Sequence, residues 1–386
     1  MPWRETTATG TAALEDLLRT DRAERFDLAA PPLLRATLVH GADRDRLLLT
    51  LHHIIADGWS VSVLLRELRA AYRGEELPGP ADPHPYLSHL AGRDREGARA
   101  AWRRALAGLD GPTLLLPPDP TGTAEPGPAR PEHLDVSVPE QLTADLTTYA
   151  RTHGLTLSTV VHGAWGLLLG GLTGSADVTF GTTVSGRTTE VDGLDAAVGL
   201  FINTVPARLG VRPWDSLTDA LLRLQDEHAG LLDHHHLGLA DIQRAAGTGE
   251  LFDTLVVFEN YPAPEDPAEE PLITGAEVFD AVHYPLALVV HPGRTLRLRW
   301  KHDATRLDHA AVRTLADRYV TLLRTLVSDP ALPAARLDLL SEREHERLAE
   351  LNATAHTVPE ATLATAFAAQ AERTPWPPPS SSRAPG

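Results

Sequence analysis

Cysteine is absent from the 386-residue chain, and lysine occurs only once. Without cysteine the chain has no disulfide bond, no thiolate nucleophile and no cysteine-ligated zinc, which is compatible with the cytoplasmic location that we predict. No apolar run approaches the ~20 residues of a membrane-spanning helix, and residues 165–172 come nearest. Residues 1–7 also lack the basic and apolar regions of a signal peptide.

Positive charge is scarce as well, with 35 Lys and Arg against 52 Asp and Glu and a formal net charge of −17. Phosphate backbones and anionic lipids repel such a chain, so we expect neither nucleic acid nor a membrane as a partner. Apolar residues make up 42% of the chain and charged residues 23%, as in globular proteins. The length exceeds the usual limit for one compact core and predicts two lobes or domains.

Strand and helix patterns alternate along the chain, which predicts an α/β fold. Residues 34–39 and 47–53 are expected to pair as antiparallel strands, with a helix from residue 58 to Gly74 and a proline-marked loop over residues 78–85. A linker rich in Pro at residues 117–131 separates the two lobes. Further strands are predicted at 133–138, 178–184, 201–209, 254–259 and 295–302, and helices at 95–109, 139–151, 158–169, 216–232, 309–326 and 342–352. Trp59, Trp102, Trp165 and Trp214 are expected to anchor the core.

The residues with the clearest chemical potential are two adjacent histidines, His52 and His53, at the end of a predicted strand. Neighbours on a strand face opposite ways, so only one of them can point into a given cleft. A neutral imidazole there is suited to act as a general base near neutral pH. A bare histidine pair is more often structural, but the string His-His-x-x-x-Asp57-Gly58 between a strand and a helix is more specific.

The string from His52 to Ser60 is similar to the signature of condensation domains of non-ribosomal peptide synthetases, which belong to the chloramphenicol-acetyltransferase-like superfamily. The resemblance covers about residues 20–345. Other stretches that resemble the family, in the expected order, are residues 25–28, 32–35, 198–208, 234–243 and 251–262.

The resemblance implies an α/β architecture with two lobes, mixed sheets flanked by helices, and a tunnel between the lobes. Phosphopantetheine arms of the upstream and downstream peptidyl carrier proteins enter the tunnel from opposite ends. The implied reaction is peptide-bond formation between a donor acyl or peptidyl thioester and an acceptor aminoacyl thioester. No metal and no directly bound cofactor are implied, and an adjoining adenylation domain is an expected partner.

The same resemblance assigns roles to individual residues. His53 matches the catalytic histidine, which either deprotonates the amine or positions it. The Gly58 N–H is a candidate oxyanion donor. Asn203 either lines the tunnel or ties strands together through its amide. The remaining expected roles are support of the motif (His52, Asp57 and Gly58) and lining of the tunnel (Trp59 and Ser60).

Two further stretches have competing interpretations. Ser185-Gly186-Arg187 either carries a bridging loop with an arginine near the site or is a surface turn. His234-His235-His236 resembles a metal site, but neighbouring residues on a helix point about 100° apart and cannot easily converge on one ion, so a polar helix end is favoured.

The chain departs from the family near both ends. The first two family motifs are expected before residue 20 and are absent; one supplies an arginine that pairs with the motif aspartate, so Asp57 needs another partner. We therefore expect a partial N-terminal lobe at 1–125, a C-terminal lobe at 126–340, and a linker with the truncated start of an adenylation domain and a disordered tail at 341–386.

The sequence Asp57-Gly58-Trp59-Ser60 resembles that of elongation domains that take an L-configured donor. Epimerisation domains are the second choice of enzyme subtype. Because the first lobe is expected to be incomplete, the alternative function is a non-catalytic remnant or a platform that recruits carriers or other proteins.

Overall fold

The computed structural model describes residues 1–116, 130–260, 273–280, 282–355 and 361–374. Most of the predicted linker and the whole predicted tail lie outside these ranges, as do Tyr261 and Pro262 of the last family-like stretch. The chain divides into two compact units, residues 1–339 and 340–386. The predicted boundary between two lobes at residue 125 stays a prediction.

A small sheet comes first in the chain, with strand order β1 (Trp3–Thr7), β2 (Leu34–His40) and β3 (Arg46–Leu51). The antiparallel pairing of β2 with β3 confirms the prediction, whereas the parallel strand β1 and the helix α1 (Thr11–Ala23) were not predicted. A buried ion pair fastens α1 to the sheet, because Arg35 Nε on β2 lies 2.9 Å from the Asp21 carboxylate. The predicted second strand is two residues too long: β3 ends at Leu51 and leaves both histidines in the turn that follows.

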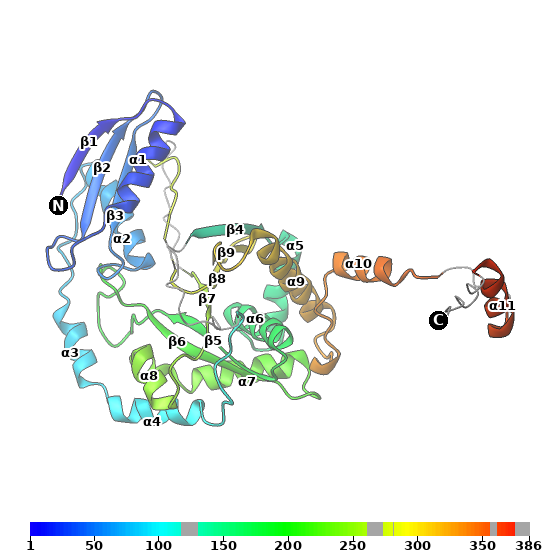
Figure 1. Ribbon diagram of the computed structural model, residues 1–386. Helices are drawn as coiled ribbons and strands as arrows, with labels where there is room; N and C mark the ends of the chain where they lie inside the picture. Colours follow the sequence, from blue (N-terminus) through cyan, green and yellow to red (C-terminus); the bar gives the residue numbers. More distant parts are fainter. Residues whose placement is uncertain (117–129, 261–272, 281, 356–360, 375–386) are drawn as a thin grey trace, which may run out of the picture. The chain divides into compact units, whose positions relative to one another are not determined.

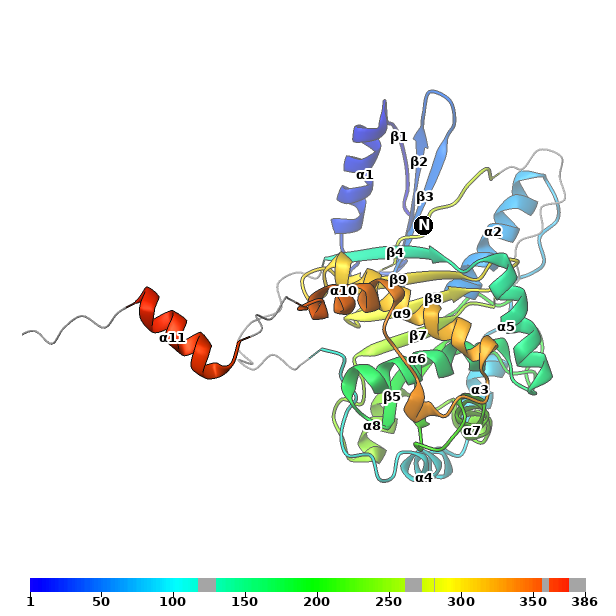
Figure 2. The ribbon, with the colours of Figure 1, turned by 90° about the vertical axis from the view of Figure 1, so that its right-hand side faces the viewer.

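The larger sheet has the strand order β4-β9-β8-β7-β5-β6, with antiparallel and parallel pairs mixed. Helices α5, α6, α7 and α9 pack together and against its strands (Figures 1 and 2). This arrangement confirms mixed sheets flanked by helices. The bounds are β4 Pro131–Ser137, α5 Glu140–Thr152, α6 Leu157–Thr173, β5 Asp177–Val184, β6 Asn203–Gly210, α7 Leu217–Ala229, β7 Thr254–Phe258, β8 Leu286–His291, β9 Arg297–Asp303 and α9 His309–Ser328.

Aromatic side chains form the centre of the core beside the larger sheet. Trp165 on α6 contacts Trp300 on β9 edge to face at 5.8 Å between ring centroids, and Trp300 contacts Tyr319 on α9 at 5.6 Å. All three are fully buried, which confirms Trp165 as a core residue. Trp214 was wrongly predicted as a core anchor: it is 75% exposed, in the loop before α7.

Helices α2 (Gly58–Tyr72), α3 (His84–Gly92), α4 (Arg95–Ala105) and α8 (Leu239–Ala246) complete the first unit. Most of α2 was predicted, with Gly74 just beyond its end in the left-handed region. The loop predicted over residues 78–85 ends earlier than expected, because α3 takes Pro85 into its first turn, where a missing N–H costs nothing. In the second unit, α10 (Glu342–Asn352) begins with a capping box between Ser341 and Glu344, and α11 is Leu363–Arg373.

No single helix in the described part of the chain is long and apolar enough to cross a membrane. Helices α5 and α6 pass such a test only when taken together, and they are bent by 102° relative to each other.

Candidate active site

The histidine pair lies in a tight turn between β3 and α2. The Ile55 N–H donates to the His52 carbonyl at 3.1 Å, which closes the turn, and the Ile54 N–H donates to His52 Nδ1 at 3.1 Å. The His52 ring also meets Phe26 edge to face at 6.4 Å. His52 therefore holds the turn in shape.

His53 is the next residue of this turn, and it is exposed. Among the described residues, no group is hydrogen-bonded to its imidazole. The two histidines thus differ: the ring of His52 is hydrogen-bonded within the turn, whereas the ring of His53 is exposed and makes no hydrogen bond to the described residues.

Asp57 is the N-cap of α2 and is almost completely buried. Its Oδ1 accepts hydrogen bonds from the Ser60 N–H at 2.9 Å and the Ser60 hydroxyl at 2.8 Å, and its Oδ2 accepts from the Phe201 N–H at 3.0 Å. The Asp57 N–H donates to the Gly199 carbonyl at 3.1 Å. One carboxylate therefore starts the helix and binds it to the bridging segment, which we define as residues 185–202, between β5 and β6.

Arg187 of the bridging segment is the cationic partner of Asp57, at 3.2 Å from Nη2 to Oδ1. Nη1 of its guanidinium donates to the carbonyls of Leu194 and Ala197, and its Cζ atom lies 4.2 Å from the Phe201 ring centroid. Its side chain is only 7% exposed. Of the two interpretations of this stretch, a bridging loop with an arginine near the site is the one that the geometry supports.

The residue before Arg187 must be glycine. Gly186 has φ +63°, and a Cβ atom at this position would lie 1.9 Å from the Phe201 carbonyl oxygen. Only glycine tolerates both the left-handed backbone and this close approach. The backbone at Gly186 thereby directs the Arg187 side chain back toward Asp57.

Burial alone would raise the pKa of Asp57, but the net pKa lies below its ordinary value. Hydrogen bonds from the N–H groups of Ser60 and Phe201 and from the Ser60 hydroxyl outweigh the burial, and the Arg187 charge adds to them. Asp57 therefore carries a negative charge at neutral pH.

This lowered pKa predicts a pH dependence of stability. A carboxyl whose pKa is lower in the folded state stabilises the fold above its unfolded pKa of about 3.9, and this contribution is lost as the pH falls through the folded pKa. We expect Asp57→Asn to reduce the free energy of unfolding at pH 7, and the gap between wild type and variant to narrow as the pH falls below about 4. Urea unfolding from pH 7 to pH 3 measures this gap. A gap that stays constant over the range contradicts the prediction.

The side chains of Trp59 and Ser60 also bind the bridging segment. Trp59 Nε1 donates to the Asp195 carbonyl at 2.8 Å. Ser60 Oγ accepts from the Gly199 N–H at 3.0 Å, and the Gly199 carbonyl, 2.8 Å from Oγ, competes with Asp57 for the single hydroxyl proton. Ser60 is completely buried, whereas Trp59 is partly exposed. Gly58 is the first residue of α2, where backbone N–H groups have no acceptor within the helix.

Asn203 begins β6, and its amide nitrogen donates to two carbonyls, those of His235 and Leu237, each at 2.8 Å. Both N–H groups of the amide are thus used in fastening β6 to the segment before α8. This geometry favours the tying role that the sequence left open for Asn203.

We expect Asn203→Ala to lower the free energy of unfolding by about 1–3 kcal/mol, because two partly buried carbonyls lose their donor. Chemical denaturation measures this loss. The exposed Asn352→Ala at the end of α10 is the matched control and is expected to change stability by no more than about 0.5 kcal/mol. Equal effects of the two substitutions would contradict the assignment.

The triplet His234-His235-His236 was expected at the end of a helix. It lies instead at the end of the 3-10 turn η1 (Leu232–His234) and just beyond it. The His234 carbonyl accepts from Trp102 Nε1 at 3.0 Å, and the His235 ring lies between Trp102 and His228. Burial, with the neighbouring histidines, lowers the pKa of His235 to about 4. These contacts make the triplet part of the packing around Trp102, which is itself fully buried as predicted.

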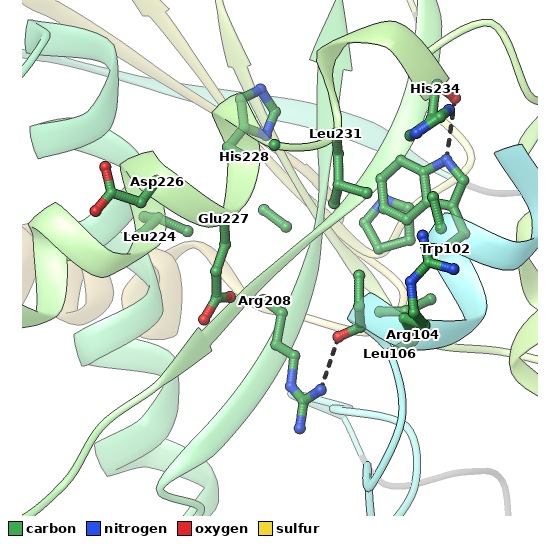
Figure 3. A pocket seen from close by; sticks show the side chains of 15 residues that line it. Trp102, Arg104, Leu106, Arg208, Leu224, Asp226, Glu227, His228, Leu231 and His234 are labelled. Carbon is green, nitrogen blue, oxygen red and sulfur yellow. Dashed lines mark hydrogen bonds between the residues drawn. The ribbon is translucent and has the colours of Figure 1, made fainter. Parts of the chain in front are cut away.

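A cavity of about 480 Å³ lies next to this packing. Figure 3 shows the side chains from α4, β6 and α7 that line it. Arg208 on β6 and Glu227 on α7 line it, and Arg208 donates to the carbonyl of Ala105 at 2.8 Å. Burial raises the pKa of Glu227. No residue of the string from His52 to Ser60 lines this cavity.

The sequence could not show that the bridging segment reaches α2. Tyr86 on α3 packs edge to face on Phe201 at 4.9 Å between ring centroids, and Leu194, Ala197 and Phe201 form a small buried cluster. No spacing pattern links residues so far apart, because their contact exists only in the folded chain.

Comparison with known proteins gives a consistent result. The family profile described as "Condensation domain" matches residues 3–349. An alignment of 382 positions that covers 94% of this chain is 33% identical to a linear gramicidin synthase subunit from Brevibacillus parabrevis. An alignment of 329 positions that covers 82% of this chain is 36% identical to chondramide synthase from Chondromyces crocatus. The chain spans only 7% and 8% of those two proteins.

Solved structures show the same fold. The first condensation domain of the calcium-dependent antibiotic synthetase matches with a TM-score of 0.69 and 23% identity, over 88% of this chain and 78% of that one. The X-domain from teicoplanin biosynthesis matches with a TM-score of 0.70 and 24% identity, over 88% of this chain and 82% of that one.

Proposed function

Because this chain belongs to the condensation-domain family, we propose that it joins a donor acyl or peptidyl thioester to an acceptor aminoacyl thioester while both are held on peptidyl carrier proteins. The observation that carries the proposal is the exposed imidazole of His53. His53 lies in a turn that a hydrogen bond from the Ile54 N–H to the His52 ring stabilises. The turn is followed by α2, whose N-cap is Asp57.

The proposed step forms one C–N bond and breaks one C–S bond. The neutral amine of the acceptor attacks the donor thioester carbon, the donor phosphopantetheine leaves as a thiolate, and the proton that the nitrogen loses ends on that thiolate. His53 either takes this proton or holds the amine in place. Because a thioester is already activated, holding both reactants in position supplies much of the rate.

The carbonyl oxygen of the donor becomes negatively charged in the tetrahedral intermediate. The Gly58 N–H is the group we propose to stabilise it, because it lies at the N-terminus of α2, where the helix dipole favours negative charge.

The partners in this proposal are an upstream and a downstream peptidyl carrier protein and an adjoining adenylation domain. Substrates arrive on phosphopantetheine, and the domain itself binds no diffusible cofactor. We propose the cytoplasm as the location, on the basis of the family resemblance.

The test is reconstitution with purified components. The chain is incubated with a donor carrier and an acceptor carrier, each loaded with an aminoacyl phosphopantetheine, and the acceptor carrier is followed by intact mass. We expect a dipeptidyl acceptor carrier, and none when the donor carries free phosphopantetheine. A folded chain that forms no product contradicts the proposal.

A platform that recruits another protein is the second candidate. The X-domain from teicoplanin biosynthesis, which matches this chain with a TM-score of 0.68, was solved in complex with OxyB. Similarity at 24% identity concerns the fold alone, so the reconstitution experiment decides between the two functions. Product that depends on His53 excludes a purely non-catalytic role.

A further inference from the structure

Three potential metal ligands lie close together at one corner of the large sheet. None of them belongs to the string from His52 to Ser60. They are Glu132 on β4, His302 on β9 and His309 at the start of α9. One ring nitrogen of each histidine and one carboxylate oxygen of Glu132 all lie within 4.8 Å of one another.

His302 gives this cluster its significance. The residue is only 3% exposed, and in the described part of the chain neither of its ring nitrogens has a hydrogen-bond partner. Burying an unpaired polar group costs free energy, so native structures nearly always give such a group a partner. One ring nitrogen of His302 lies beside the donors of Glu132 and His309, where a bound cation would supply a partner for that nitrogen.

The backbone fixes the three ligands in place. Glu132 and His302 are direct partners across the antiparallel pair β4–β9, so their side chains emerge on the same face. The turn from β9 to α9 is closed by Asp303, whose carboxylate accepts from the N–H groups of Thr305 at 2.9 Å and Arg130 at 3.1 Å. His309 is the first residue of α9 after its N-cap, Asp308.

We propose that Glu132, His302 and His309 form a binding site for a divalent transition metal ion, with Zn²⁺ as the best fit. Two imidazoles and one carboxylate with a water molecule make the four-coordinate set of many zinc sites, whereas Mg²⁺ and Ca²⁺ prefer oxygen ligands. The bound ion would link β4 to the corner between β9 and α9.

The site needs only small side-chain movements. Donors about 2.1 Å from zinc in a tetrahedron are roughly 3.4 Å apart, so donor atoms that lie within 4.8 Å of one another need to approach by at most about 1.4 Å. His309 is exposed and can turn toward the ion. Arg130, which lies 2.8 Å from the Glu132 carboxylate, has a 70% exposed side chain, and an exposed ion pair of this kind is easily displaced.

The test uses the full chain, freed of metal by a chelator, with Co²⁺ or Zn²⁺ as the only addition. We expect one equivalent of Co²⁺ to bind with the visible absorption of a tetrahedral nitrogen and oxygen site, and Zn²⁺ to displace it. Zn²⁺ is also expected to raise the unfolding temperature, because a ligand that binds only the folded state stabilises it.

Variants locate the site. His309→Ala and Glu132→Gln change residues at least partly exposed to solvent, so both are expected to fold; each should weaken Zn²⁺ binding at least about tenfold and abolish the Co²⁺ absorption. His133→Ala is the matched control, because His133 neighbours Glu132 on β4 but faces the other side of the sheet; it should bind as wild type does. The proposal is overturned if wild type shows no Co²⁺ absorption, or if all three variants bind alike.

Discussion

Replacing His53 with alanine is expected to slow formation of the dipeptidyl acceptor carrier by about 10²- to 10⁴-fold, the range that a general acid–base or positioning group supplies. The fold is expected to survive, because the imidazole is exposed and no hydrogen bond links it to the described residues. The measurement is the initial rate of product formation by intact mass, together with circular dichroism and an unfolding curve of each variant.

The matched control is His84→Ala, which removes an exposed histidine on α3 and is expected to leave the rate unchanged. His52→Ala is informative in a different way. Its ring accepts from the Ile54 N–H and packs on Phe26, so this variant should lose stability as well as rate. A His53→Ala protein that is folded and as fast as wild type would show that another group performs the proposed role.

Replacing Arg187 with alanine is expected to lower the free energy of unfolding by about 3–5 kcal/mol, the cost of removing one partner from a buried ion pair. Asp57 would keep its buried charge without a cation, and the carbonyls of Leu194 and Ala197 would lose their donor. Denaturant unfolding of the two proteins measures the difference.

Two further variants identify the interaction as the cause. Arg294→Ala breaks a pair with Glu140 that is exposed on both sides, so the loss should be no more than about 1 kcal/mol. In the double variant with Asp57→Asn, the loss should be smaller than the sum of the two single losses, because the unpaired charge is then absent. Strictly additive losses would show that the two side chains act independently.

Condensation activity should fall with Arg187→Ala even in the folded fraction, since Arg187 anchors the bridging segment to the start of α2, beside the His53 turn. Arg187→Lys is expected to rescue little of either property. A lysine ammonium cannot contact Asp57 at one end and two carbonyls at the other as the planar guanidinium does.

The interpretation of Asp57 shows how far sequence reasoning reached. The family resemblance requires an arginine partner for this aspartate, and the stretch that supplies the partner in the family was not found in this chain. The structure pairs Asp57 with Arg187, which lies 130 positions later. The sequence left two alternatives for residues 185–187, a bridging loop with an arginine near the site or a surface turn. A Ser-Gly-Arg sequence is compatible with both.

The metal site is a case that the sequence could not indicate. The expected absence of metal was drawn from the family and from the poor geometry of His234-His235-His236. Glu132 and His302 lie 170 positions apart, and they become neighbours only through the β4–β9 register. Adjacent histidines are conspicuous in a sequence, whereas ligands gathered by strand pairing leave no local pattern.

Local patterns were sufficient wherever the physics is local. Two short runs rich in Leu, Val and Thr on either side of a polar turn predicted the β2–β3 pair, helical spacing predicted α2, and the string from His52 to Ser60 identified the family. The order of the strands, the end of β3 before the histidines, and the partners of Asp57, Asn203 and His302 were decided by the tertiary structure alone. Each of these depends on contacts between distant residues, whose free energy comes from packing and burial that no single segment contains.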